Sequence, residues 1–194
     1  MRLKTIKKGE YGYIGFQKKK VLIITILLFL IALGIYFFGL KTYGNNKNLF
    51  TIIAVLGLLP ACKSFVSLIM FFKAKSVSED TYKKISSVCN AEEGLYELEM
   101  TSEKKSFSIS HLYIANNLIL GYSENEKIDV NEWEEFVTQI LKLNQIKNVT
   151  IKLYKDINKY TARIAEHKNN IEADLETITV KHNELISLMK DISL

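Results

Sequence analysis

Two long apolar runs decide the fold of this chain: VLIITILLFLIALGIYFFGL at Val21–Leu40, and LFTIIAVLGLLPACKSFVSLIMFF at Leu49–Phe72. The first run has no charged residue, the second has one lysine, and a short polar loop at Lys41–Asn48 separates them. A helix of about 20 apolar residues can cross a hydrocarbon core of roughly 30 Å. The sequence therefore predicts a transmembrane helical hairpin over residues 21–72, with helices at about 21–40 and 49–72.

Charge divides the 194-residue chain at the end of the second run. Residues 1–72 carry ten Lys and Arg residues against one Glu, whereas residues 73–194 carry sixteen against twenty Asp and Glu residues. A mildly acidic C-terminal part lacks the basic surface of a nucleic-acid binder, so we expect no nucleic-acid partner. The basic flanks of the apolar runs suit an anionic lipid surface, so the lipid bilayer is the expected partner.

Lysine placement predicts the topology of the hairpin. Seven basic residues precede the first run and four follow the second closely, whereas the connecting loop holds two. Segments rich in Lys and Arg stay on the cytoplasmic side of a membrane. We therefore expect a multi-pass protein of a bacterial cytoplasmic membrane with both termini in the cytoplasm. The bacterial origin rests on the heavy use of Lys, Asn and Ile.

The first 20 residues predict a membrane-interface segment. Aromatic rings lie between glycines and next to a lysine cluster, and such rings and ammonium groups favour the level of the lipid headgroups. The residues concerned are Tyr11, Tyr13, Phe16, Lys18, Lys19 and Lys20. A solvated basic tail is the alternative interpretation.

The second apolar run carries small residues on one helical face, at Ala54, Gly57, Ala61 and Ser64. Small side chains let helix backbones approach closely in lipid, so this strip predicts packing on the first helix. Lys63 is the one charged residue within either run. It predicts either snorkelling to the headgroups or pairing with an acidic group of another membrane protein or a second copy of the chain.

Residues 76–194 predict a cytosolic α/β (α+β) domain around a small mixed sheet, in the order α-β-β-β-α-β-α-α. Alternating apolar residues predict the strands, and apolar residues three or four apart predict the helices. The expected elements are a helix at 78–89, strands at 95–101, 106–115 and 118–122, a helix at 129–145, a strand at 149–154, and helices at about 157–170 and 180–192. From Ile157 to Ile192 an Ile or Leu residue recurs at every seventh position, across both of these helices and the break expected between them.

The same alternation assigns the strand side chains to faces. In the first strand the expected core side chains are Tyr96, Leu98 and Met100, with Glu97 and Glu99 on the other side. In the second strand the side chains expected on one face are Phe107, Ile109, His111 and Tyr113.

The clearest helix start in the chain is at Asp129. Its carboxylate can cap the backbone while Glu132 closes a capping box. One apolar stripe follows, formed by Trp133, Phe136, Val137, Ile140 and Leu141. We expect this stripe to face the core.

Acidic residues are the candidates for catalysis. The predicted element order is similar to that of restriction-endonuclease-like folds, whose nucleases hold a metal with an acid and a Glu-x-Lys pair. Glu103 and Lys105 match that pair by residue type but fall in a predicted turn. Glu97 and Glu99 form a carboxylate pair on one strand, a pattern that a solvated strand face also gives.

Metal and cofactor sites are not indicated. His111, His167 and His182 lack the spacing of metal ligands with one another and with Cys89. The glycines near the N-terminus follow no strand, so they do not form a phosphate-binding loop. We therefore expect neither a metal nor a cofactor.

Three stretches carry a resemblance to a known family: GEYGYIGFQKKK at residues 9–20, VLGLLPACKSFVSLIMFFKAK at residues 55–75 and YELEMTSEKKSFSISHLYI at residues 96–114. With the closing ISL, they resemble a family of small two-helix membrane proteins of low-GC bacteria. Members are sometimes labelled "O-linked GlcNAc transferase-like", although no nucleotide-sugar motif or helical repeat supports that label here. The resemblance covers most of the chain and implies a bacterial membrane protein.

The sequence favours a membrane-tethered cytosolic interaction or regulatory module over an enzyme. Two alternatives stay open. One is an enzyme of unrecognised type on the cytosolic membrane face, with a degenerate nuclease-like core or a transferase activity. The other is an accessory subunit that docks into a larger membrane complex through the hairpin. A shifted carboxylate pKa in a deep pocket would favour the enzyme, and an exposed apolar patch would favour the module.

Overall fold

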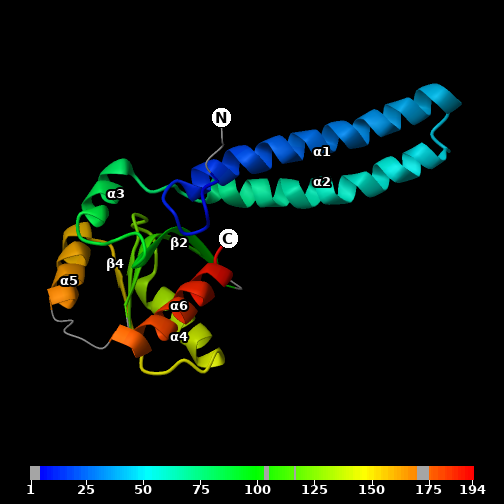
Figure 1. Cartoon of the computed structure of the whole chain (residues 1–194). Coiled ribbons are helices and arrows are strands. Elements are labelled where there is room, and N and C mark those ends of the chain that lie inside the picture. The colour runs from blue at the N-terminus through cyan, green and yellow to red at the C-terminus, as the bar shows by residue number, and fades with distance from the viewer. Residues whose placement is uncertain (1–4, 103–104, 116, 170–174) are drawn as a thin grey trace. The chain divides into compact units, whose positions relative to one another are not determined.

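The computed structural model describes residues 5–102, 105–115, 117–169 and 175–194, with the side chains of residues 175–181 outside the described part. The described elements are six helices and four strands (Figure 1), so the predicted mixed α+β character is confirmed. The chain divides into a hairpin unit, Ile14–Ala74, and an α/β unit made of residues 5–13 and Lys75–Leu194.

Helices α1 (Tyr13–Tyr43) and α2 (Leu49–Lys73) form the hairpin. Asn48 caps α2, because its side-chain oxygen accepts a hydrogen bond from the Thr51 backbone N–H at 2.9 Å. Both helices are long and apolar enough to cross a membrane. The two long apolar helices predicted from the sequence are therefore present.

The predicted strip of small residues faces α1: Ala54, Gly57, Ala61 and Ser64. Ala54 and Ala61 are buried, and a Cβ atom on Gly57 would lie 3.8 Å from the Ala32 side chain. The Ser64 hydroxyl lies 2.7 Å from the Thr25 hydroxyl. The two helices therefore approach closely along this strip, as small side chains allow.

Four strands form one mixed sheet in the order β1-β2-β3-β4. Strands β1 (Gly94–Thr101), β2 (Ser106–Ala115) and β3 (Leu118–Tyr122) are antiparallel neighbours. Strand β4 (Thr150–Tyr154) runs parallel to β3, and α4 (Val130–Leu143) makes the crossover that a parallel pair requires.

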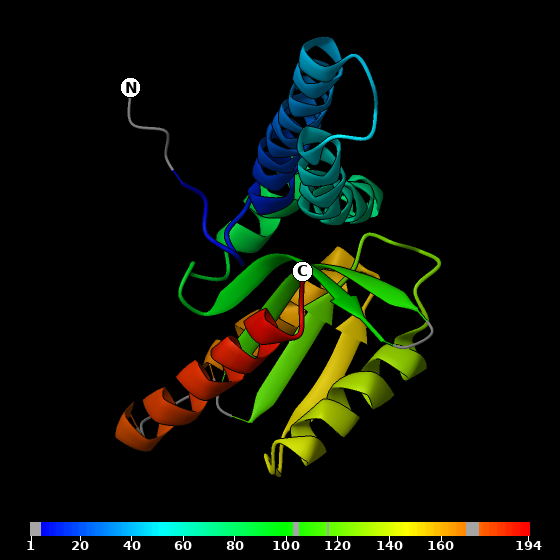
Figure 2. The ribbon, with the colours of Figure 1, turned by 90° about the vertical axis from the view of Figure 1, so that its right-hand side faces the viewer.

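Helices cover both faces of the sheet, as Figures 1 and 2 show. The tyrosine face lies under α3 (Glu79–Ser86) and α5 (Ile157–Asn169), and its buried tyrosines are Tyr96, Tyr113, Tyr122 and Tyr160. The aliphatic face lies under α4 and α6 (Leu175–Asp191), with Trp133 and Leu185 among its buried residues.

The prediction that four β2 side chains share one face is wrong. Phe107 and Ile109 pack in the aliphatic face, whereas Tyr113 packs in the tyrosine face and His111 bonds to a tyrosine there. Both strands change face at the same point, between the pairs Tyr96–His111 and Leu98–Ile109, where Glu97 of β1 has a left-handed backbone with φ 55°. A left-handed non-glycine residue interrupts the two-residue period of a strand.

Strand β1 shows the matching change. Tyr96 lies on the tyrosine face while Leu98 and Met100 lie on the aliphatic face, although strict alternation predicts one face for all three. Glu97 is buried, and its carboxylate accepts a hydrogen bond from the Val77 backbone N–H at 3.1 Å. This bond ties the interrupted point of β1 to the segment that enters α3.

The last two helices lie on opposite faces of the sheet. Ile164 of α5 is buried in the tyrosine face and Leu185 of α6 in the aliphatic face. The seven-residue repeat therefore does not form one continuous stripe. The predicted break falls partly on residues 170–174, which lie outside the described part, and α6 begins at Leu175 rather than near 180.

The segment before α1 belongs to the α/β unit. The Gly9 carbonyl accepts a hydrogen bond from the Tyr96 backbone N–H at 2.8 Å, which covers part of the outer edge of β1. Gly9 has φ 90°, and a Cβ atom there would lie 2.7 Å from the Leu95 side chain. Only glycine therefore fits this approach to the strand without strain.

Side chains of the same segment strengthen the attachment. The Lys8 ammonium donates to the Ser193 carbonyl at 2.6 Å, and the Tyr11 ring stacks on the Tyr82 ring with centroids 4.1 Å apart. The α/β unit thus includes residues outside the predicted range 76–194, and the predicted segment 1–20 is divided between the two units. Contact of that segment with lipid headgroups stays a prediction.

Candidate functional site

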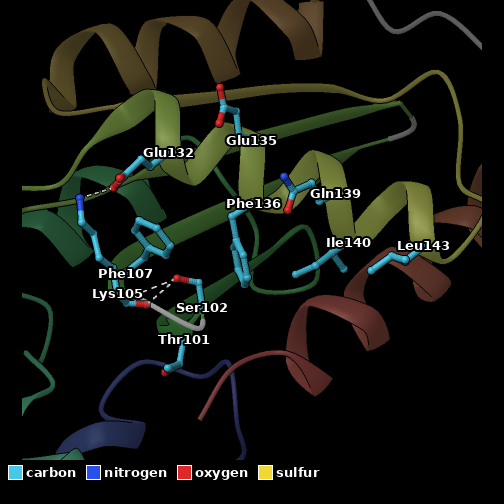
Figure 3. A pocket seen from close by; sticks show the side chains of 10 residues that line it. All are labelled: Thr101, Ser102, Lys105, Phe107, Glu132, Glu135, Phe136, Gln139, Ile140 and Leu143. Carbon is cyan, nitrogen blue, oxygen red and sulfur yellow. Dashed lines mark hydrogen bonds and ion pairs between the residues drawn. The ribbon is translucent and has the colours of Figure 1, made fainter.

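An open groove of about 440 Å³ lies on the α/β unit between α4 and the adjoining ends of β1 and β2. Figure 3 shows the lining side chains: Thr101, Ser102, Lys105, Phe107, Glu132, Glu135, Phe136, Gln139, Ile140 and Leu143. Its floor is apolar, because the Phe107 ring of β2 packs beside the Phe136 ring of α4 with centroids 5.6 Å apart. We call this the α4 groove.

Helix α4 divides its apolar side chains between the core and the groove. The core stripe repeats every four residues, at Trp133, Val137 and Leu141. Phe136 and Ile140 are only partly buried, and Leu143 is 83% exposed. The prediction of one stripe facing the core is therefore wrong in part. The apolar side chains of α4 extend farther around the helix than the surface that the sheet covers, so some of them stay accessible to solvent.

The first turn of α4 closes one end of the groove. Asp129 is confirmed as N-cap, because its carboxylate accepts from the backbone N–H groups of Asn131 and Glu132 at 3.1 and 3.2 Å. The Glu132 carboxylate instead binds the Lys105 ammonium at 2.6 Å and raises the pKa of that lysine. This ion pair joins α4 to the start of β2 across the groove (Figure 3).

Charged residues continue along the outer side of α4, around a second hollow of about 440 Å³. The Glu134 carboxylate accepts a hydrogen bond from the Leu153 backbone N–H at 2.9 Å, so it caps the outer edge of β4. Glu135 and Lys142 are exposed, and neither has an ion-pair partner among the described residues. Glu135 lines both hollows and Lys142 lines the second one, so the outer side of α4 carries two uncommitted charges of opposite sign.

The acidic candidates from the sequence are not gathered into one site. Glu97 is bonded to the Val77 backbone, and Glu103 lies outside the described residues. Burial raises the pKa of Glu99, whose Oε2 atom has no hydrogen-bond partner in the described part of the chain. The described candidates are Glu97, Glu99 and Lys105. Of these, Lys105 alone lines the groove, where its ammonium pairs with the Glu132 carboxylate.

His111 is fully buried on the tyrosine face. Its Nδ1 atom lies 2.6 Å from the Tyr160 hydroxyl, which lies 3.4 Å from the Leu120 carbonyl oxygen. The short distance between Nδ1 and the hydroxyl makes each of these two groups the hydrogen-bond partner of the other. Burial lowers the pKa of His111 to about 3, so the ring is neutral. A Cβ atom on Gly94 would lie 2.5 Å from Nε2, which shows how closely this ring is packed.

Further titratable groups of the tyrosine face are also held in structural roles. Burial raises the pKa of Cys89 to about 12, so the thiol stays protonated and is a poor nucleophile. The Tyr113 hydroxyl lies 3.3 Å from Nδ1 of His167, and Lys168 forms an ion pair with Glu93. Within the described residues, no three His, Cys, Asp or Glu side chains lie close enough to bind a metal.

The remaining residues named from the sequence lie in or near the hairpin helices. Tyr13 is buried and Phe16 is partly buried. The Lys18 ammonium donates to the Ala74 carbonyl at 2.8 Å, while Lys19 and Lys20 are exposed. Lys63 is exposed on α2.

No known family model, curated protein or solved structure matches this chain. Its function is therefore inferred from its own geometry. The α4 groove was not predicted from the sequence, because the helical period placed Phe136 and Ile140 in the core. The sequence did contain a signal for the groove, because the apolar stripe of α4 continues to Leu143. That stripe is wider than the contact of one helix with the sheet requires.

Proposed function

We propose that this protein is a membrane-tethered interaction module that holds a partner helix in the α4 groove at the cytosolic face of a bacterial membrane. The observation that carries this proposal is the spacing of the α4 residues that line the groove: Glu132, Glu135, Phe136, Gln139, Ile140 and Leu143. Steps of three and four residues over three turns make one continuous stripe. Such a stripe forms the ridge on which a second helix packs.

The hairpin supplies the tether in this proposal. In the most apolar stretches of α1 and α2, 11% and 17% of the residues are buried, whereas the core helix of a soluble protein is mostly buried. Before the hairpin, the chain is attached to β1 by the hydrogen bond between Gly9 and the Tyr96 backbone. After the hairpin, it is attached to β1 again by the hydrogen bond from the Val77 backbone N–H to Glu97. Both ends of the hairpin thus connect to the same folded unit, so a partner bound to that unit would be tethered to the membrane through the hairpin.

The choice between a binding module and an enzyme depends on two residues. Burial raises the pKa of Glu99, but Glu99 lines neither the α4 groove nor the second hollow beside it. Leu143 is an exposed apolar residue at the groove. A perturbed carboxylate favours catalysis when it lies in a pocket, and an exposed apolar surface favours binding. A binding role is therefore supported better, and no catalytic residue is proposed.

Cysteine labelling tests the proposed topology. In a Cys62→Ser background, Asn45→Cys in the hairpin loop should react with a membrane-impermeant thiol reagent added to intact cells. Glu126→Cys in the α/β unit should react only after the cells are permeabilised. Labelling of Glu126→Cys but not Asn45→Cys in intact cells would invert the topology.

Photo-crosslinking in living cells tests the docking role. A photoreactive amino acid at Gln139, in the groove, should form a discrete protein adduct. The matched control position is Asn158, which is exposed on α5 over the other face of the sheet. Equal adducts at both positions, or none at Gln139, would contradict helix docking in the groove.

Lys63 favours a second candidate function, that of an accessory subunit docking through the hairpin. Its ammonium is exposed on α2, and neither apolar run contains an acidic residue to pair with it. The test compares Lys63→Leu with Lys63→Arg by complex size in a mild detergent. Pairing with an acidic partner predicts that Leu loses the complex while Arg retains it. An unchanged complex in the Lys63→Leu variant would exclude this function and leave snorkelling.

A further inference from the structure

The outer flank of α4 carries opposite charges near its two ends. Glu135 and Lys142 are seven residues apart, so they project to nearly the same side and lie about 10 Å apart along the helix axis. That separation is too large for an ion pair within one helix. Both are exposed and without an ion-pair partner among the described residues, whereas Glu132 and Glu134 are committed to Lys105 and to a β4 backbone N–H.

An identical helix laid antiparallel on α4 meets these charges in reverse order. A two-fold axis near Thr138 and Gln139 reverses the helix direction but keeps the same flank of both helices together. Glu135 of each copy then lies opposite Lys142 of the other, which makes two ion pairs. We infer that the helix held in the α4 groove is α4 of a second copy of this chain. The inference rests on the proposed docking function and names its partner.

The apolar flank of α4 fits the same arrangement. Phe136, Ile140 and Leu143 lie on the opposite side of the stripe from Glu135 and Lys142, as the helical phase requires. The two-fold rotation brings Phe136 of one copy beside Ile140 of the other. Gln139 lies at the axis, where two amide groups can donate to and accept from each other. Apolar side chains therefore meet on one flank while opposite charges meet on the other.

Charge exchange tests this pairing in the full chain, purified in a mild detergent and sized by analytical ultracentrifugation. The wild-type chain should form dimers. Glu135→Lys and Lys142→Glu each place like charges opposite each other twice, so each should weaken dimerisation about ten-fold or more. The double variant, Glu135→Lys with Lys142→Glu, restores opposite charges and should recover wild-type dimerisation. A monomeric wild-type chain, or a double variant as weak as the single ones, would overturn the inference.

A cross-linking measurement locates the contact independently. In the Cys62→Ser background, Gln139→Cys lies at the axis and should give covalent dimers with a short bis-maleimide linker, whereas Asn158→Cys should not. The photoreactive probe at Gln139 separates this inference from the function on which it rests. An adduct with a different protein would overturn the second-copy inference and support docking, while no adduct would contradict both.

Discussion

The two faces of the sheet use their helices differently. On the tyrosine face, hydroxyl and imidazole groups are bonded to one another, between the buried Tyr160 and His111 and between the buried Tyr113 and the partly buried His167. On the aliphatic face, apolar side chains fill the core under Trp133, and part of α4 stays open at Leu143. Bonded polar groups favour one arrangement of a core, whereas open apolar surface favours binding. In our proposal, the first face therefore contributes mainly fold specificity, and the second face provides the surface for interaction.

The largest effect is expected at the centre of the aliphatic face. The Trp133 side chain is fully buried, and its ring lies 2.9 Å from where a Cβ atom of Gly121 would be. Trp133→Ala should therefore reduce the free energy of unfolding of the α/β unit by about 3–5 kcal/mol. Pulse proteolysis of the full chain in urea and detergent measures this change. A loss as small as that of Trp133→Phe would show that Trp133 is not a core anchor.

A smaller loss is expected on the tyrosine face. Tyr160→Phe removes the hydroxyl that is hydrogen-bonded to His111 Nδ1 and leaves that nitrogen without this partner in a buried site. The free energy of unfolding should fall by about 1–3 kcal/mol. Tyr154→Phe is the matched control, because Tyr154 packs on the same cluster and its hydroxyl has no hydrogen bond among the described residues. Equal losses for the two variants would argue against the polar network as a source of stability.

His111 should also make stability depend on pH. Its pKa is about 3 in the folded chain against an ordinary value of 6.5, so between these values the unfolded chain binds more protons. Stability should therefore fall as pH falls from about 6.5, by up to about 1.4 kcal/mol per pH unit from this group. His111→Asn should remove this part of the slope. An unchanged slope in that variant would show that His111 is not enclosed as described.

The smallest effect on stability is expected in the α4 groove. Leu143→Ser changes an exposed side chain, so the free energy of unfolding should stay within about 0.5 kcal/mol of wild type. The same change should weaken dimerisation in detergent, because Leu143 lines the groove that we propose as the docking surface. A large loss of stability with dimerisation intact would reverse the roles assigned to core and groove.

Part of this structure could be predicted from the sequence. The two long helices follow from uninterrupted apolar runs, and the start of α4 follows from the cap at Asp129. These features depend only on residues that are close together in the sequence and on the period of the α-helix. The same holds for the N-cap Ser78 of α3, which accepts a hydrogen bond from the Thr81 backbone N–H.

Other features depend on contacts between distant residues. The face switch in β1 and β2 needs a left-handed backbone at Glu97, which no strand pattern reveals. The attachment of Gly9 to β1 joins residues that are far apart in the sequence. The α4 groove was missed because periodicity shows how wide an apolar arc is but not how much of it the sheet covers. Phe136 and Ile140 therefore looked like core residues.

Thiol protection in membranes tests most directly whether the α4 groove is occupied. In the Cys62→Ser background, Leu143→Cys would be labelled with maleimide in inside-out membrane vesicles and again after dilution in detergent. The buried Cys89 thiol, with its raised pKa, should contribute little labelling. An occupied groove predicts slow labelling of Leu143→Cys in membranes and fast labelling after dilution, while Asn158→Cys reacts at the same rate in both. Equal rates for Leu143→Cys in the two conditions would contradict the docking role.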